Sequence, residues 1–161
     1  MVEGKILTES MEDYLEMFYR LFTKQGYVRP VDLSDAIGVL PSSVTKMIQK
    51  LNEAGFITYE KYRHISLTPL GLEYGKFLVW RDETLKEFLH LFGNLEGVEE
   101  QVEGIEHYII PQTMYIFSNL LAFFKAHPDE LQAFLSFKKE QPCACGKGLH
   151  LLRAWLFRHT E

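Results

Sequence analysis

The apolar residues of the first seventy positions change their spacing once, and this change constrains the fold more than any other feature. Three segments repeat apolar residues at offsets of three and four, which predicts amphipathic helices. They cover about residues 10–24, 31–37 and 41–54. From Phe56 to Thr68 apolar and polar residues alternate instead, which predicts a β-hairpin with Lys61-Tyr62-Arg63 at its tip. This order of elements is typical of a winged helix-turn-helix, a DNA-binding fold.

Hydroxyl and proline residues mark the expected helix starts. Ser10 is expected to cap the first helix, with Asp13 three residues later as in a capping box. Proline favours the first position of a helix, which predicts further starts along the chain. These starts are Pro41, Pro69, Pro111 and Pro128. We expect the helix from Pro69 to reach about Phe92, and another helix to cover about residues 98–110.

Three residues in the middle of the chain, Glu103, Glu106 and His107, have the spacing of a metal-ligand set. On a helix, offsets of three and four residues bring side chains to one face. Two carboxylates and an imidazole suit Mn²⁺ or Fe²⁺ better than Cu⁺ or structural Zn²⁺. The alternative is an ordinary solvated helix face. The same alternative applies to Asp13 and Glu16, and to Asp82 and Glu83, which are surface carboxylates unless the fold brings them together.

The third expected helix has a polar side suited to DNA. Hydroxyl, amide and ammonium groups donate to phosphates and to base edges in the major groove. This side carries Ser42, Ser43, Thr45, Lys46, Gln49 and Lys50. Lys61 and Arg63 at the hairpin tip would contact the DNA backbone or the adjacent minor groove. The alternative is a polar outer face with no DNA partner.

Charge and composition limit the other functions. The net charge of −5 opposes nucleic-acid binding weakly, but residues 1–70 hold 8 Lys and Arg against 9 Asp and Glu, whereas residues 71–161 hold 9 against 13. No apolar run is long enough to span a bilayer and no leader opens the chain, so we expect a cytoplasmic protein without a membrane partner. No Gly-rich phosphate loop or serine-nucleophile motif is present, so we expect no enzyme. A metallohydrolase built on the clustered carboxylates is a minor alternative.

We expect a mainly α protein with three parts. Residues 1–70 form a winged-helix DNA-binding domain with a small β-hairpin wing, and residues 71–140 form an all-helical metal-binding and dimerisation domain. The second part is rich in Phe and Leu, so we expect it to bury apolar surface against a second copy as a homodimer. Residues 141–161 form a tail with an amphipathic pattern. There Cys143, Cys145 and His150 could form a soft-metal or redox site, but incidental thiols are the favoured interpretation.

Four stretches, in order, carry a family resemblance: residues 10–16 (SMEDYLE), 41–47 (PSSVTKM), 59–63 (YEKYR) and 102–107 (VEGIEH). They closely resemble the diphtheria-toxin-repressor family of metal-dependent bacterial repressors, and in particular its manganese-responsive regulators. The likeness runs from about Ser10 to Phe137. It implies a homodimer that binds palindromic double-stranded operator DNA and represses metal-uptake genes when Mn(II), or alternatively Fe(II), is plentiful.

The resemblance also implies a two-metal site in each subunit. Carried over by motif, its ligands are Asp13, Glu16, Glu103, Glu106 and His107. The family's remaining ligand is a histidine that follows an arginine, but here Asp82 follows Arg81. We expect Asp82 to be a ligand that makes the site harder, or else the second metal position is altered or lost. The rival hypothesis is a winged-helix regulator that responds to a small molecule or a redox signal, with carboxylates that bind no metal.

Overall fold

The computed structural model describes residues 7–59, 65–93 and 96–140. It divides into two compact units, residues 1–118 and 119–161. The first unit contains every residue expected to bind metal or DNA that the structure describes. Apart from one short hairpin, the described chain is helical, which confirms the expected mainly α fold class.

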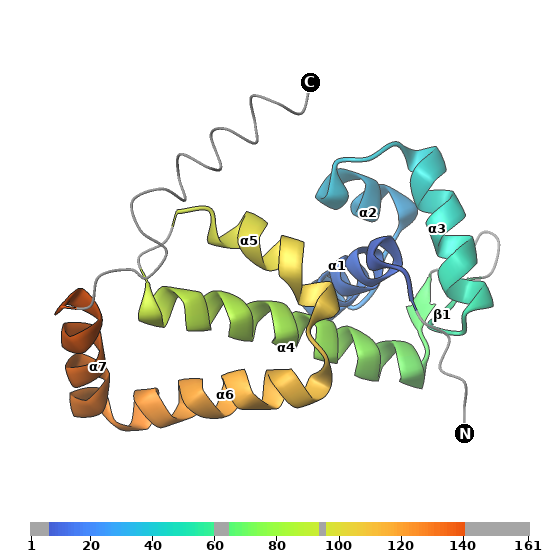
Figure 1. Cartoon of the computed structure of the whole chain (residues 1–161). Helices are drawn as coiled ribbons and strands as arrows, with labels where there is room; N and C mark the ends of the chain where they lie inside the picture. The colour runs from blue at the N-terminus through green and yellow to red at the C-terminus, as the bar shows by residue number, and fades with distance from the viewer. Residues whose placement is uncertain (1–6, 60–64, 94–95, 141–161) are drawn as a thin grey trace. The chain divides into compact units, whose positions relative to one another are not determined.

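The first unit begins with three helices and a hairpin (Figure 1). The helices are α1 (Glu9–Gln25), α2 (Pro30–Ile37) and α3 (Pro41–Glu53). Strands β1 (Ile57–Thr58) and β2 (Ser66–Leu67) pair antiparallel, with Ile57 opposite Leu67 and Thr58 opposite Ser66. The predicted order of helices and strands is therefore confirmed. The hairpin tip that carries Lys61 and Arg63 lies outside the described residues.

The start of α1 differs from the expectation. Thr8, not Ser10, is the N-cap: its backbone is extended, and its hydroxyl oxygen accepts a hydrogen bond from the Met11 N–H at 3.3 Å. Leu7, directly before Thr8, is buried in the core. Because this anchor directs the chain into the helix early, Ser10 falls in the first turn and the predicted Ser10 cap was wrong.

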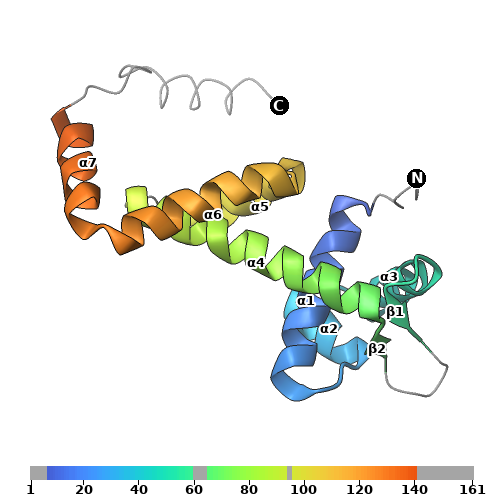
Figure 2. The same cartoon turned by 90° about the horizontal axis from the view of Figure 1, so that it is seen from below.

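The core of this region lies where α1, α2, α3, the hairpin and α4 (Pro69–Phe92) meet (Figure 2). Its fully buried side chains include Leu15, Phe18, Leu33, Ile48 and Leu78. Burying each such side chain contributes about 1.5–3 kcal/mol to stability. The core therefore fixes α1 against α2, α3 and α4.

Two glycines let α4 approach its neighbours closely. A Cβ atom at Gly71 would lie 1.8 Å from the backbone oxygen of Phe56, and one at Gly75 would lie 2.8 Å from Cβ of Tyr19 on α1. Thr68 caps α4, with its hydroxyl oxygen accepting the Gly71 N–H at 3.1 Å. The start predicted at Pro69 is confirmed, and the close packing sets the distance between α4 and α1.

The helix expected over residues 98–110 is shorter. Helix α5 (Val98–Ile105) is followed by a 3₁₀ turn, η1 (Glu106–Tyr108), and two residues separate this turn from α6 (Pro111–Ala126). Proline disfavours a helical backbone in the residue before it, and this opposes a helix that runs through Ile110. A second small core of Leu85, Val98, Val102 and Met114 holds α5 and the start of α6 on α4. Glu106 and His107 therefore belong to a tight turn.

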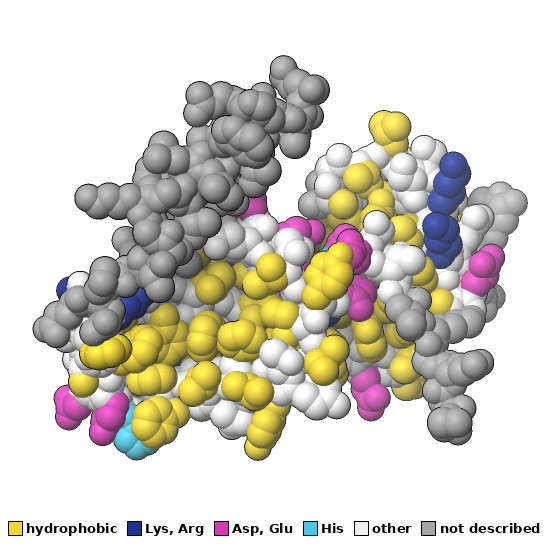
Figure 3. Space-filling model, viewed as in Figure 1, with side chains coloured by type: hydrophobic (Ala, Val, Ile, Leu, Met, Phe, Trp, Pro, Cys, Tyr) yellow, Lys and Arg dark blue, Asp and Glu magenta, His cyan; other side chains and the backbone are white. Residues whose placement is uncertain are grey.

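The second unit holds the end of α6, from Asn119, and α7 (Pro128–Glu140). The rings of Phe124 and Phe134 lie 5.6 Å apart and pack the two helices together. Several large apolar side chains of these helices are exposed, among them Leu120, Phe123 and Phe137. Hydrophobic side chains also gather over α6 in Figure 3. Among the described residues, we find no helix with the length and apolar character needed to cross a bilayer.

Candidate metal centre and nucleic-acid interface

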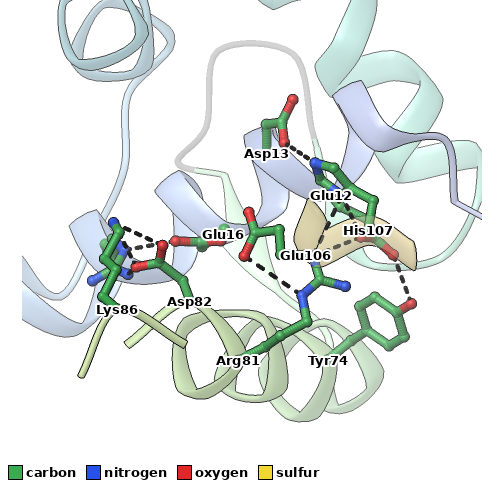
Figure 4. A network of polar contacts seen from close by, with 10 residues as sticks. Glu12, Asp13, Glu16, Tyr74, Arg81, Asp82, Lys86, Glu106 and His107 are labelled. Carbon is green, nitrogen blue, oxygen red and sulfur yellow. Dashed lines mark hydrogen bonds and ion pairs between the residues drawn. The ribbon is translucent and has the colours of Figure 1, made fainter. Parts of the chain in front are cut away.

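Asp13 of α1 meets Glu106 and His107 of η1. One ligand atom from each residue lies within 4.8 Å of the other two, and this is the one such group found in the described part of the chain. Nε2 of His107 is 3.1 Å from Oδ1 of Asp13. Figure 4 shows these side chains converging from their two elements. We call Asp13, Glu106 and His107 the three-ligand cluster.

Glu106 is the buried member of this cluster. Its side chain is 3% exposed, and its Oε2 atom has no hydrogen-bond partner, lying 3.6 Å from Nε of Arg81. Burial and then the charge of Glu16 raise the pKa of Glu106 to about 7. A buried carboxylate oxygen without a hydrogen bond is uncommon and calls for a partner. A divalent cation would satisfy it, so the donor set fits such an ion.

His107 is oriented by Glu12. Nδ1 of the imidazole is 2.8 Å from Oε2 of Glu12. Burial opposes protonation of His107, but this contact and the charge of Asp13 raise its pKa above the usual value. In the neutral ring, an Nδ1–H donated to Glu12 leaves the Nε2 lone pair on the side of Asp13, as in many metal-binding histidines.

Glu12 is held by two further donors. The Tyr74 hydroxyl donates to Oε1 at 3.0 Å, and Nη2 of Arg81 donates to Oε2 at 2.9 Å. Burial would raise the pKa of Glu12, but the hydrogen bonds from His107 and Arg81 lower it. Sequence reasoning missed Glu12, Tyr74 and Arg81. Glu12 adjoins Asp13 in the first motif, but its partners are 62 to 95 residues away, so local spacing carried no sign of its role.

Glu16 and Asp82 lie in a second, ion-paired group beside the cluster. Nε of Arg20 donates to Oε1 of Glu16 at 2.9 Å, and Nη2 of Arg20 donates to Oδ2 of Asp82 at 2.7 Å. Nζ of Lys86 is 2.7 Å from Oδ1 of Asp82. We call Glu16, Arg20, Asp82 and Lys86 the ion-paired group. It places two of the expected ligands next to each other, outside the three-ligand cluster.

Glu103 lies at the rim of the site. It is exposed on α5, one turn before Glu106. Burial is the main cause that raises the pKa of Asp13, and the negative charge of Glu103 adds to it. Glu103 is therefore near enough to act on Asp13 electrostatically, although it is not part of the three-ligand cluster.

The exposed side of α3 carries all six residues expected to face DNA. Ser42, Ser43, Thr45, Lys46, Gln49 and Lys50 are exposed, whereas Val44, Ile48 and Leu51 are buried on the opposite side. Basic side chains lie over α3 in Figure 3. Lys61 and Arg63, and also Cys143, Cys145 and His150 of the tail, lie outside the described residues.

Comparison with known proteins places these features in a family. Residues 6–65 match the profile described as iron dependent repressor, N-terminal DNA binding domain. Residues 68–135 match the profile described as iron dependent repressor, metal binding and dimerisation domain. The chain belongs to the iron-dependent repressor family. Asp13 lies in the first of these family domains, and Glu106 and His107 lie in the second.

Relatives within the iron-dependent repressor family include proteins named HTH-type transcriptional regulator MntR. The one from Listeria welshimeri is 42% identical over 136 residues, which cover 84% of this chain and 96% of the relative. The one from Lysinibacillus sphaericus is 45% identical over 123 residues, covering 76% and 88%. These relatives confirm the resemblance seen in the four motifs. They are named as transcriptional regulators, as expected for this family.

Solved structures of the same family share the fold. A manganese-dependent transcriptional repressor in complex with manganese has a TM-score of 0.61 at 27% identity, covering 70% of this chain and 53% of that chain. The repressor ScaR with bound Zn²⁺ has a TM-score of 0.58 at 28% identity, covering 70% and 54%. This chain thus spans just over half the length of those structures. As a member of the family, it is a metal-dependent DNA-binding repressor.

Proposed function

We propose that this chain is a Mn(II)-responsive repressor of metal-uptake genes that acts as a homodimer on palindromic operator DNA. The observation that carries the proposal is the three-ligand cluster, which joins α1 of the DNA-binding domain to η1 of the metal-binding domain. The relatives named MntR and the similar structure with manganese support this metal. Two carboxylates and one imidazole also suit Fe(II), which is the alternative activator.

Asp13, Glu106 and His107 would hold the ion, with Glu103 beside them. Partial burial of Asp13, nearly complete burial of Glu106 and the nearby carboxylates oppose ionisation, so the pKa of each is raised. A bound divalent ion supplies positive charge that stabilises both carboxylates in their ionised form. Glu12 and Arg81 keep His107 turned towards Asp13. The side chains are therefore already oriented to bind a cation.

The link from this cluster to DNA runs through α1. Helix α1 packs on α2, α3 and α4. A restraint on Asp13 therefore acts on the helix that supports the exposed face of α3. In a homodimer, two such faces would meet successive major grooves when they lie about 34–36 Å apart. Metal binding would favour the arrangement in which all ligands meet, which is a shift of population between conformations.

Selection of duplex DNA from a random pool tests the proposal. With Mn²⁺ present, we expect the full chain to enrich a palindromic sequence and to bind it at least tenfold more tightly than with a chelator. Asp13→Ala should remove this difference. Equal binding with Mn²⁺ and with chelator would contradict the proposal. A larger effect of Fe²⁺ than of Mn²⁺, measured without oxygen, would assign the sensor to iron.

A further inference from the structure

The ion-paired group contains two permanent positive charges next to the three-ligand cluster. Both carboxylate oxygens of Asp82 are engaged: Arg20 contacts Oδ2 at 2.7 Å, and Lys86 contacts Oδ1 at 2.7 Å and Oδ2 at 3.0 Å. Arg20 also contacts Oε1 of Glu16 at 2.9 Å and Oε1 of Glu83 at 3.2 Å. One guanidinium thus bridges three carboxylates. A metal ion would have to displace this fixed cation to bind the same oxygens.

The ion-paired group and the three-ligand cluster differ in whether their buried carboxylate oxygens have hydrogen-bond partners. The side chain of Asp82 is 8% exposed, yet it has three short contacts with cations. Glu106 is similarly buried, but its Oε2 has no hydrogen-bond partner. Charge-assisted hydrogen bonds of this length are strong. A metal ion that replaced them would lie close to the guanidinium and ammonium groups and would be repelled by their positive charges. Of these buried carboxylates, the one with an oxygen that lacks a hydrogen-bond partner therefore belongs to the three-ligand cluster.

The contacts of Arg20 also have a structural effect. Arg20 lies on α1, and Asp82 lies 62 residues later on α4. Their hydrogen bond ties these two helices together. At the three-ligand cluster, His107 of η1 contacts both Glu12 and Asp13 of α1. The link between α1 and α4 is thus already made by charged side chains, whereas Oε2 of Glu106 at the three-ligand cluster has no hydrogen-bond partner.

We propose that Arg20 and Lys86 act as built-in cations that keep Glu16 and Asp82 from binding metal, so that each subunit takes one divalent ion, at the three-ligand cluster. This inference rests on the proposed function. It assigns Asp82 a pairing role in place of the ligand role suggested by its position after Arg81. The response to metal then follows a single ion per subunit, without cooperation between two ions in one subunit.

The test is the number of Mn²⁺ ions bound per full-length chain, measured by metal analysis after equilibrium dialysis and by electron paramagnetic resonance. We expect one ion for the wild type, and two for the double variant R20Q/K86Q once circular dichroism shows that it is folded. Lys76→Gln, an exposed lysine of α4, is the matched control and should leave one ion bound. Two ions bound to the wild type, or one ion bound to the folded double variant, would overturn the inference.

Asp82→Asn tests the same inference without removing a cation. The isosteric amide should leave the affinity for one Mn²⁺ ion within twofold of the wild type, whereas a loss of tenfold or more would show that Asp82 is a ligand. If the double variant does not fold, this variant and the wild-type stoichiometry decide the question. A wild type that binds no Mn²⁺ would instead reject the proposed function itself, so the two failures are distinguishable.

Discussion

Nδ1 of His107 lies 2.8 Å from Oε2 of Glu12, although 95 residues separate them in the chain. This contact leaves Nε2 of the same ring facing Asp13 at 3.1 Å. Partners of this kind fix the ring orientation and tautomer of a metal-binding histidine, and their loss typically lowers metal affinity 10- to 100-fold. Glu12 is thus expected to matter to metal binding without touching the ion.

Glu12→Gln should therefore weaken Mn²⁺ binding about tenfold while leaving the number of ions bound unchanged. The amide keeps the size of the side chain but removes the charge that orients His107. Titration with Mn²⁺ measures the effect, and Glu73→Gln, an exposed glutamate of α4, is the control. Wild-type affinity in Glu12→Gln would refute the orienting role.

Acidification should release the metal. Glu106, whose pKa is raised to about 7 by burial and by the charge of Glu16, must lose its proton to bind a cation, and so must His107. Below pH 7 the protonation of Glu106 alone therefore costs up to about tenfold in affinity for each unit of pH. Mn²⁺ titrations at pH 8, 7 and 6 measure this dependence. An affinity that stays constant across this range would contradict the assignment of Glu106.

Without metal, the stability of the protein should have the opposite pH dependence: it should fall as the pH rises. Because the folded-state pKa of Glu106 is raised from 4.5 to about 7, its favourable contribution is fully present below pH 4.5 and is lost as the pH rises through 7. Glu106→Gln stays neutral and escapes this loss. We expect the variant to gain on the order of 1–2 kcal/mol in unfolding free energy over the wild type between pH 5 and pH 8.

Chemical denaturation in the presence of a chelator measures this difference. At pH 5 the two proteins should differ little, and at pH 8 the variant should be the more stable. Saturating Mn²⁺ should stabilise the wild type and not the variant, because the amide is a poorer ligand. A stability difference that is independent of pH would show that Glu106 is not strained by its burial.

The exposed face of α3 should contribute electrostatically to DNA binding. Lys46→Ala and Lys50→Ala should each weaken binding to the selected operator, and each should reduce the salt slope of binding by about 1 if the ammonium group contacts a phosphate. Anisotropy titrations at several salt concentrations measure the slope. Lys76→Ala on α4 is the control. An unchanged slope in both α3 variants would remove this face from the interface.

Gly71 should be required for the packing of α4. A methyl group there would collide with the backbone oxygen of Phe56, which cannot move aside as a side chain would. We expect Gly71→Ala to lower the unfolding free energy by about 2–3 kcal/mol. Gly104→Ala is the matched control, since its new methyl group meets nothing within 4 Å and alanine favours a helix. Equal stability of the two variants would argue against close packing of α4 on the hairpin.

The helix starts were predictable because proline restricts the backbone locally. The starts expected at Pro41, Pro69, Pro111 and Pro128 all match the structure. The Ser10 cap was wrong because two hydroxyl residues lie within three positions, and the burial of Leu7, a tertiary effect, decides between them. Local rules therefore locate helices well and their first residues less well.

The site was predictable only as a set of candidate ligands. Periodicity indicated that Glu103 shares a face with Glu106 and His107, but it does not distinguish an α-helix from the 3₁₀ turn that the structure contains. The partners that tune these residues were not predictable. Arg20 and Glu12 contact groups more than sixty residues away, and such pairings depend on how the helices pack. Spacing within one segment carries no information about them.

The division of the cluster between α1 and η1 also constrains how this protein can be re-engineered. A chimera that takes its first sixty residues from another regulator would inherit that protein's choice of operator together with its version of Asp13. It would respond to metal only if the transplanted helix placed an acidic side chain beside His107, in the position of Asp13. If the exposed face of α3 contacts the operator as proposed, point substitutions on that face would change operator choice and leave Asp13 in place.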